Sequence, residues 1–203
     1  MESSENIWKT RYNHPSAWEQ DFPPLSMVDM VVGSATAKPD AVMMDFMGRK
    51  TTYGEMFHVI RRVARGLQDL GVGKGDRVGL YLPNVPHYVA GYYGAMMAGA
   101  TVVNFSPLYT AAELEHQVED SGTKILFTLS ARALLPTALE VLDNSSLERL
   151  VVGCVAEVLP PTKSVLFRLF KRKETAPVPH DPRITHYADL LRHGEDPAPV
   201  PID

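Results

Sequence analysis

The residues most suggestive of chemistry form one glycine-rich run, Gly71-Val72-Gly73-Lys74-Gly75-Asp76. Glycines and a lysine are what a backbone cradle for phosphate uses, but a P-loop needs Lys-Ser or Lys-Thr at the start of a helix. A dinucleotide fingerprint needs glycine where Asp76 stands, and no predicted strand is followed by that fingerprint. The run instead leaves a predicted helix, whereas anions bind at helix N-termini. We therefore interpret it as a connector and disfavour a dinucleotide-binding domain.

Two histidine groupings have only part of a metal site. Glu113 and His116 share one face of a predicted helix, but Glu113 is assigned to a capping box. His180, Asp181 and His186 lie in a proline-rich tail, where a zinc site lacks a third convincing ligand. No Ser or Thr has an obvious neighbouring base, so nucleophilic catalysis has no support. We therefore assign no catalytic, cofactor-binding or metal-binding residue in this chain.

The segment 163–173 differs from these motifs because it combines basic and apolar side chains. It carries five basic residues without an acid, namely Lys163, Arg168, Lys171, Arg172 and Lys173, and five large apolar ones, namely Val165, Leu166, Phe167, Leu169 and Phe170. Such a segment can hold a protein reversibly at an anionic membrane. The alternatives are a surface helix whose apolar side packs on the body, and a disordered loop. All three interpretations stay open at the level of sequence.

Composition excludes several classes of protein. The 203 residues are 45% hydrophobic and 22% charged, values typical of globular domains, and a net charge of −4 gives no general affinity for nucleic acid. The chain has no signal-peptide pattern, and no apolar stretch approaches the ~20 residues that span a bilayer. The single Cys154 lies in a hydrophobic run and is interpreted as a core residue. We expect a cytoplasmic protein, peripheral to the inner face of the membrane if 163–173 binds lipid.

The first part of the chain predicts an arm, a hairpin and a helix. Residues 1–25 carry aromatic side chains among prolines, so we expect an irregular arm laid on the body. Residues 41–46 read as a strand and 47–50 as a turn. A helix follows, because Thr52 and Glu55 have capping-box spacing, apolar residues recur every three or four positions, and Gly71 supplies a left-handed stop.

The middle of the chain predicts alternating strands and helices. The expected strands are 77–82, 101–105, 124–129 and 149–155. The expected helices open at Asn84 with Pro86 and close at Gly99, run from a Thr110–Glu113 capping box to Gly122, and extend from Ser130 to Leu142. Small residues in the first of these helices, Ala90, Gly91, Gly94, Ala95 and Ala98, predict a tight helix–sheet contact. The fold class is therefore α/β, with a largely parallel sheet flanked by helices.

The last part of the chain breaks this regularity. Eight of the 16 prolines fall between residues 160 and 203, and only 183–192 reads as ordered. We therefore divide the chain into an arm (1–25), an α/β subdomain (26–159) and a basic, proline-rich excursion and linker (160–203).

Four segments resemble the adenylate-forming enzymes. Residues 52–56 (TYGEM) resemble their TYxEL motif, 71–84 (GVGKGDRVGLYLPN) their GxxxGDRVxxxxPN segment, and 97–107 (MAGATVVNFSP) their AGxxxVxxNP segment. The run 104–122 (NFSPLYTAAELEHQVEDSG) is especially close to bacterial long-chain fatty acyl-CoA synthetases, where NPLYTxxELxHQxxDSG is typical. Phe105-Ser106 between Asn104 and Pro107 is a small departure. The resemblance covers residues 7–203 and is strongest between 51 and 129.

The resemblance implies the first lobe of the synthetase N-terminal domain and a two-step ligase. A carboxylate attacks Mg-ATP to give an acyl-adenylate and pyrophosphate, and coenzyme A then displaces AMP. ATP, Mg and coenzyme A are thus implied for the full-length parent, with fatty acid as substrate. The family's phosphate loop and catalytic lysine are absent from these 203 residues, so we expect an inactive fragment that binds no cofactor.

The implied partners are the remaining lobes of the parent, including a missing ATP-binding lobe. We expect residues 148–155 and 195–203 to meet it, and the apolar area left exposed to favour a homodimer. The alternative is a non-catalytic α/β module that binds a partner or a membrane.

Overall fold

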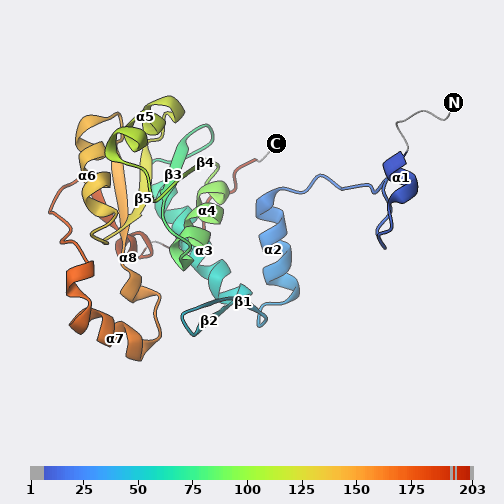
Figure 1. Ribbon diagram of the computed structural model, residues 1–203, viewed down its shortest axis with the longest axis horizontal. Coiled ribbons are helices and arrows are strands. Elements are labelled where there is room, and N and C mark those ends of the chain that lie inside the picture. The colour runs from blue at the N-terminus through green and yellow to red at the C-terminus, as the bar shows by residue number, and fades with distance from the viewer. Residues whose placement is uncertain (1–6, 193, 195, 202–203) are drawn as a thin grey trace.

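The computed structural model describes residues 7–192, 194 and 196–201. Its centre is a β-sheet with helices on both sides, and a separate two-stranded hairpin lies below it in Figure 1. The elements in chain order are α1 Ile7–Arg11, α2 Met27–Ala37, β1 Val42–Phe46, β2 Arg49–Thr52, α3 Tyr53–Asp69, β3 Arg77–Tyr81, α4 Pro86–Met97, β4 Thr101–Phe105, α5 Ala111–Ser121, β5 Ile125–Leu129, α6 Leu135–Asn144, β6 Arg149–Gly153, η2 Val155–Glu157, α7 Pro161–Phe170, η3 Arg172–Glu174, β7 Ile184–His186 and α8 Tyr187–Leu190. The predicted α/β class is confirmed.

The sheet has the strand order β4-β3-β5-β6-β7, and all four pairings are parallel. Val78 of β3 lies opposite Val102 of β4 and Ile125 of β5, so β3 is an interior strand. Every residue of β5 is buried, as expected of a strand covered by helices on both faces. The four strands expected between residues 77 and 155 are therefore present, and β7 adds a fifth.

The direction of the connections explains which helices share a face. The chain moves from β3 to β4 on one side through α4, then returns past β3 to β5 through α5 and continues to β6 through α6. Right-handed crossovers in opposite directions place their helices on opposite faces. Accordingly α3 packs with α4, whereas α5 packs with α6 across the sheet (Figure 1).

The helix boundaries predicted from caps are largely confirmed. At the start of α3, the Glu55 N–H donates to Thr52 Oγ1 at 3.2 Å and the Thr52 N–H donates to Glu55 Oε2 at 2.9 Å. Gly71 ends this helix with φ +89°, and Gly122 ends α5 with φ +64°. The residue before α4 is Val85, which makes no side-chain cap, so Pro86 alone marks the start of that helix.

The small residues of α4 serve two contacts, only one of which was predicted. A Cβ at Gly91 would lie 3.0 Å from Leu80 Cδ2 of β3, which is the expected contact with the sheet. A Cβ at Gly94 would lie 2.5 Å from Val63 Cγ1, and Val63 belongs to α3. The tightest approach at Gly94 is therefore between helices, because both helices cover the same face of the sheet.

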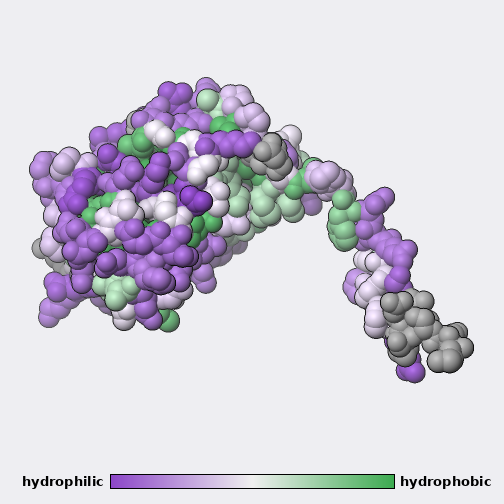
Figure 2. All heavy atoms as spheres, turned by 90° about the horizontal axis from the view of Figure 1, so that it is seen from above, coloured by the Kyte–Doolittle hydropathy of each residue, from purple (hydrophilic) through white to green (hydrophobic). Residues whose placement is uncertain are grey.

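The prediction that the arm is laid on the body is wrong. Figures 1 and 2 show it as a narrow extension clear of the body, and Trp8 and Phe22 are 53% and 82% exposed. The arm's aromatic residues contact one another instead, with the Tyr12 and Trp18 rings 5.0 Å apart at 83°.

Two other local predictions are wrong. The helix expected from Ser130 begins at Leu135, because the Ser130 N–H still donates to Gly153 O at 2.8 Å as a continuation of the sheet. Residues 149–153 are not free to meet another lobe, because β6 lies between β5 and β7 and Leu150, Val151 and Val152 are buried.

The prediction that 183–192 is ordered is confirmed, because this segment forms β7, which completes the sheet, and α8, which packs near α3. The structure contains one more helix in the proline-rich part, α7, at the end of the body (Figure 1). Residues 196–201 are irregular, but Gln68 holds them through two hydrogen bonds with Ala198, of 2.9 and 2.7 Å. Residues 195, 202 and 203, which were expected to meet another lobe, lie outside the described residues. Within the described part of the chain, no helix has the length and apolarity needed to cross a membrane.

Candidate site at the carboxyl edge of the sheet

The strand order places a topological switch point between β3 and β5. The connection after β3 leads to one side of the sheet, whereas the connection after β5 leads to the other. In open α/β sheets, ligands bind outside the carboxyl ends of the strands at such a point. Functional side chains are therefore expected where β3, β5 and β6 end, at Tyr81, Leu129 and Gly153.

His87 is the central polar residue at this edge. It is the second residue of α4, directly after the β3 end and the loop from Leu82 to Val85, and its side chain is 2% exposed. A Cβ at Gly153, the last residue of β6, would lie 2.8 Å from His87 Cδ2 and 3.0 Å from Nε2. The imidazole therefore lies directly on the end of β6, and glycine at position 153 leaves it that space.

Glu157 is the charged partner of His87. Its Oε2 lies 3.3 Å from His87 Nε2 and accepts a hydrogen bond of 3.1 Å from the Cys154 N–H. Desolvation by burial raises the pKa of Glu157, but the hydrogen bonds from His87 and the Cys154 N–H outweigh it and leave that pKa below its usual value. An ionised Glu157 can only accept a hydrogen bond from Nε2–H, so it favours the imidazole tautomer protonated at that nitrogen.

Tyr187 completes the cluster. Its ring centroid lies 4.6 Å from that of His87 at an interplanar angle of 70°, an edge-to-face contact. Burial, and then the charge of Glu157, raise the pKa of Tyr187, so the phenol stays protonated at neutral pH. His87 Nδ1 is buried without a hydrogen-bond partner among the described residues.

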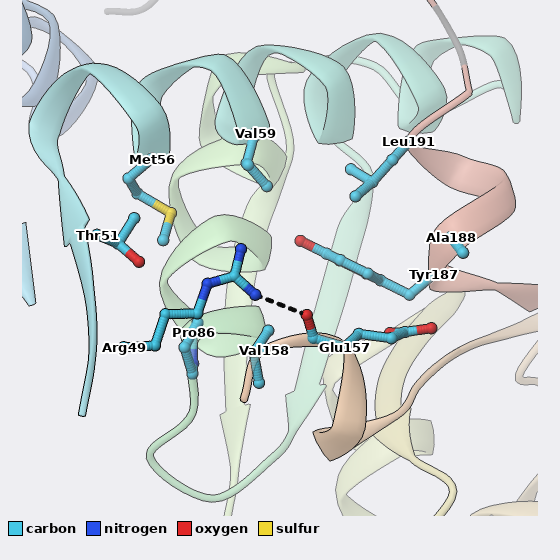
Figure 3. Close-up of a pocket in the computed structure, with 10 residues that line it drawn as sticks. All are labelled: Arg49, Thr51, Met56, Val59, Pro86, Glu157, Val158, Tyr187, Ala188 and Leu191. Carbon is cyan, nitrogen blue, oxygen red and sulfur yellow. Dashed lines mark hydrogen bonds between the residues drawn. The ribbon is translucent and has the colours of Figure 1, made fainter. Parts of the chain in front are cut away.

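A pocket of about 210 Å³ lies beside this cluster, between α3, β2, η2 and α8 (Figure 3). Figure 3 shows Met56 and Val59 of α3 facing Tyr187 and Glu157, with Arg49 donating a hydrogen bond of 2.9 Å to the Glu157 carbonyl oxygen. Ligand pockets for drug-sized molecules measure about 300–1,000 Å³. This pocket can therefore hold a few apolar carbons, and a nucleotide is too large for it.

The motifs considered from sequence lie elsewhere. The run 71–76 connects α3 to the amino end of β3, the edge opposite His87, with Gly71 and Gly75 at φ +89° and +94°. The Gly73 N–H donates to Asp76 Oδ2 at 2.9 Å, and Lys124 Nζ donates to Asp76 Oδ1 at 2.8 Å. The Asp76 carboxylate is thus used within the fold, and the run connects a helix to a strand as predicted.

The two histidine groupings do not join the His87–Glu157–Tyr187 cluster, although α5 starts at this edge and His186 ends β7 there. Glu113 is held in the cap of α5, where it accepts the Thr110 N–H at 2.9 Å, and His116 is exposed. Asp181 is engaged by Arg183, with contacts between 2.7 and 3.2 Å. Residues 7–192, 194 and 196–201 contain no group of three His, Cys, Asp or Glu side chains that could hold a metal ion.

The sequence reasoning missed His87 and Glu157. A signal was present for His87, since Pro86-His87 directly follows a buried strand and its loop, which is where an α/β sheet places functional residues. Glu157 had no such signal, because its place near His87 depends on the course of the chain after β6.

Comparison with known proteins places the chain in a family. A family model described as AMP-binding enzyme matches residues 32–191. A long-chain-fatty-acid–CoA ligase of Bacillus subtilis is 32% identical over 171 residues, covering 84% of this chain and 30% of that protein. A long-chain-fatty-acid–CoA ligase of Salmonella typhimurium is 31% identical over 196 residues, covering 94% of this chain and 34% of that protein. The chain thus spans about a third of the length of these curated relatives.

Solved structures share the fold. A long-chain-fatty-acid–CoA ligase from Archaeoglobus fulgidus superposes with a TM-score of 0.64 at 22% identity, covering 89% of this chain and 32% of that one. The anthranilate CoA ligase AuaEII, in complex with anthranoyl-AMP, gives a TM-score of 0.67 at 20% identity, covering 86% of this chain and 30% of that one. Because the family model covers well over half of the residues, the chain belongs to the family of AMP-binding enzymes.

Proposed function

We propose that this chain is a lobe of an ATP-dependent fatty acid:CoA ligase. Such a ligase joins a carboxylate to the α-phosphate of ATP with release of pyrophosphate, and the thiol of coenzyme A then displaces AMP. The observation that carries the proposal is the 31–32% identity to long-chain-fatty-acid–CoA ligases over 84–94% of the chain. The parallel sheet shared with solved CoA ligases supports it.

The described residues do not fit a magnesium triphosphate. A phosphate site at the carboxyl edge would use the free N–H groups at helix N-termini. Pro86 and Pro136 each remove one donor from the first turns of α4 and α6, and Glu113 places a carboxylate at the start of α5. The donor set is therefore poor and one position is repulsive, so no step of adenylation is assigned to these residues.

We propose instead that this lobe positions other parts of the enzyme. The His87–Glu157–Tyr187 cluster fixes the segment after β6 against α4, and Arg49 ties the β1–β2 hairpin to the same segment. These contacts hold the carboxyl edge in one shape. In this proposal the triphosphate, magnesium and coenzyme A are bound by segments outside the 203 residues, and the isolated chain does not form acyl-adenylate.

Fatty-acid-dependent exchange between pyrophosphate and ATP tests the proposal. The assay compares the 203-residue chain with the product of a reading frame that continues past Asp203, using a panel of carboxylates that differ in chain length. We expect no exchange from the chain and exchange dependent on a fatty acid from the longer product. Exchange by the chain alone refutes its inactivity, and exchange by the longer product that ignores every fatty acid refutes the substrate class.

The second candidate is a non-catalytic α/β module that binds a partner or a membrane. The exposed apolar face of α7 favours it, because an exposed apolar patch marks a surface that contacts a protein or a membrane. A stop codon directly after Asp203 supports the module. A continuing frame that encodes a Ser/Thr/Gly-rich loop followed by Lys-Gly supports the ligase.

A further inference from the structure

The helix α7 presents its apolar side chains to solvent instead of to the body. Val165, Leu166, Leu169 and Phe170 are 57%, 53%, 58% and 77% exposed, and none of the ten residues of α7 is buried. The packed-helix interpretation, in which these side chains cover the body, is therefore wrong. Figure 1 shows the helix at one end of the molecule, beyond the carboxyl edge of the sheet.

The opposite side of α7 is attached to the body by polar contacts. Ser164 Oγ donates a hydrogen bond of 2.7 Å to the Ala156 carbonyl oxygen, and Phe167 is half-buried on the same side. Lys163 Nζ donates to the Met47 carbonyl oxygen at 2.7 Å, which joins α7 to the turn of the β1–β2 hairpin. The orientation of the helix is thus set by its contacts, and the apolar face points outward as a consequence.

The exposed residues form one continuous stripe. At 3.6 residues per turn, the positions from Val165 to Phe170 that are exposed and apolar span roughly 140° of the helix. On the same projection Lys163 lies beside one border of the stripe and Arg168 toward the other. Met47, whose carbonyl oxygen is hydrogen-bonded to Lys163 at the hairpin turn, is also an apolar residue that is 56% exposed. Apolar residues between basic ones are the arrangement of a helix that lies in a membrane interface.

Charge distinguishes a lipid surface from other occupants. Residues 158–173 contain five basic residues and no acid, in a chain whose net charge is −4, and one of the five, Lys171, is paired with the following Glu174. A second copy placed symmetrically on the same face would still bring an excess of positive charge against an excess of positive charge, which is unfavourable. An anionic bilayer neutralises the basic residues and buries the apolar ones. Two such signals together are what reversible membrane attachment requires.

We propose that α7, together with the turn at Met47, docks this protein on membranes that contain anionic lipid. The helix lies in the plane of the interface, with Leu166, Leu169 and Phe170 among the acyl chains and the basic side chains at the headgroups. Attachment is electrostatic as well as hydrophobic, so it weakens as salt rises. This inference names the surface and the lipid for the membrane binding of the second candidate function, and it holds whether or not the chain is a lobe of a ligase.

Co-sedimentation of the chain with vesicles tests the proposal. One set of vesicles is pure phosphatidylcholine, and the other contains about one-third phosphatidylglycerol to give a negative surface potential. We expect sedimentation with the second set and little with the first. Raising the salt from about 0.1 M to about 1 M shortens the screening length to about 3 Å and should release most of the protein.

Matched variants assign the binding to α7. The pair Leu169→Ser and Phe170→Ser should lower the partition coefficient at least about tenfold, since each buried methylene contributes to insertion. Leu108→Ser is the control, because Leu108 is 88% exposed in the β4–α5 connection and should leave binding unchanged. The pair Lys171→Gln and Lys173→Gln should cost about fivefold for each charge removed. The control pair Arg11→Gln and Lys38→Gln removes two exposed charges elsewhere.

The possible results separate the proposal from its rivals. Loss of binding in the α7 variants alone, with unchanged thermal unfolding, supports it. Three sedimentation results overturn it, namely no sedimentation with anionic vesicles, equal sedimentation with neutral vesicles, and full binding by the α7 variants, and a fourth result comes from light scattering. If these variants instead change the molar mass measured by light scattering, a second copy covers the face and the proposal is wrong. A Phe170→Trp variant gives an independent reading, because its emission should shift to shorter wavelength only with anionic vesicles.

Discussion

The contact between α3 and α4 gives the sharpest prediction about stability. Gly94 of α4 has no room for a side chain, because a Cβ there would lie 2.5 Å from Val63 Cγ1, 2.8 Å from Val63 Cβ and 3.3 Å from the Ala64 nitrogen. Val63 is fully buried, and a β-branched side chain in a helix has one strongly preferred rotamer. The side chain cannot turn away, so Gly94→Ala must push the two helices apart.

The magnitude follows from two opposing effects. Alanine in a helix interior is about 1 kcal/mol more favourable than glycine, which stabilises the variant. Overpacking a filled core costs about 1–3 kcal/mol, and the contact with rigid Val63 and backbone points to the upper part of that range. We expect a net destabilisation of about 1–2 kcal/mol. For a chain of this size that lowers the melting temperature by about 2–8 °C.

A matched substitution in another helix makes the test decisive. Gly33 lies in α2, and a Cβ at this position would have no atom within 4 Å. Gly33→Ala therefore raises the helix propensity without a clash and should stabilise the fold by up to about 1 kcal/mol. Urea unfolding followed by circular dichroism measures both variants beside the parent chain. The reasoning is refuted if Gly94→Ala is as stable as the parent, or if both substitutions shift stability in the same direction.

Three further outcomes are expected. Thr52→Ala removes the capping box of α3 and should cost about 1 kcal/mol in urea unfolding, and an unchanged midpoint would contradict the cap. Gly153→Ala adds a methyl group 2.8 Å from His87 Cδ2 and should cost about 1–3 kcal/mol. The double variant with His87→Ala should recover part of that cost, because the imidazole that clashes is removed. If the two changes in unfolding free energy simply add, Gly153 and His87 do not interact. The pKa of Glu157 in the folded state lies below the usual value of 4.5. The ionised carboxylate therefore stabilises the fold above pH 4.5, and this contribution is lost as the pH falls through the folded-state pKa. Glu157→Gln should therefore flatten the acid limb of a stability–pH curve, and an unchanged limb would show that the carboxylate contributes little.

Local sequence patterns predicted the elements well. The caps at Thr52 and Thr110, the stops at Gly71 and Gly122, and the buried runs of the strands act within a few residues, and the structure contains each of them. Ser130 had the residue type of a cap but did not act as one, because residues 130–132 continue as extended backbone that pairs with Gly153, Glu174 and Thr175. A cap can be predicted from sequence only where no distant backbone holds the following residues out of a helix.

The candidate site was much less accessible to sequence reasoning. His87 and Glu157 are 70 positions apart in the sequence, and a single His or Glu is usually a structural or surface residue. They meet because the crossover through α4 and the turn after β6 return to the same edge of the sheet. Tyr187 joins them only because β7 pairs with β6 and directs α8 toward α3.

By itself the sequence determined the α/β class, the order of strands and helices and the family resemblance, since periodicity, caps and short motifs are local properties of the chain. Only the tertiary structure decided that Gly94 serves a helix–helix contact, that β6 is an interior strand, that the arm extends from the body and that the apolar face of α7 points to solvent. The physical reason is the same in each case. An apolar stripe shows that a side chain has something to bury, but which surface covers it depends on where distant segments pack.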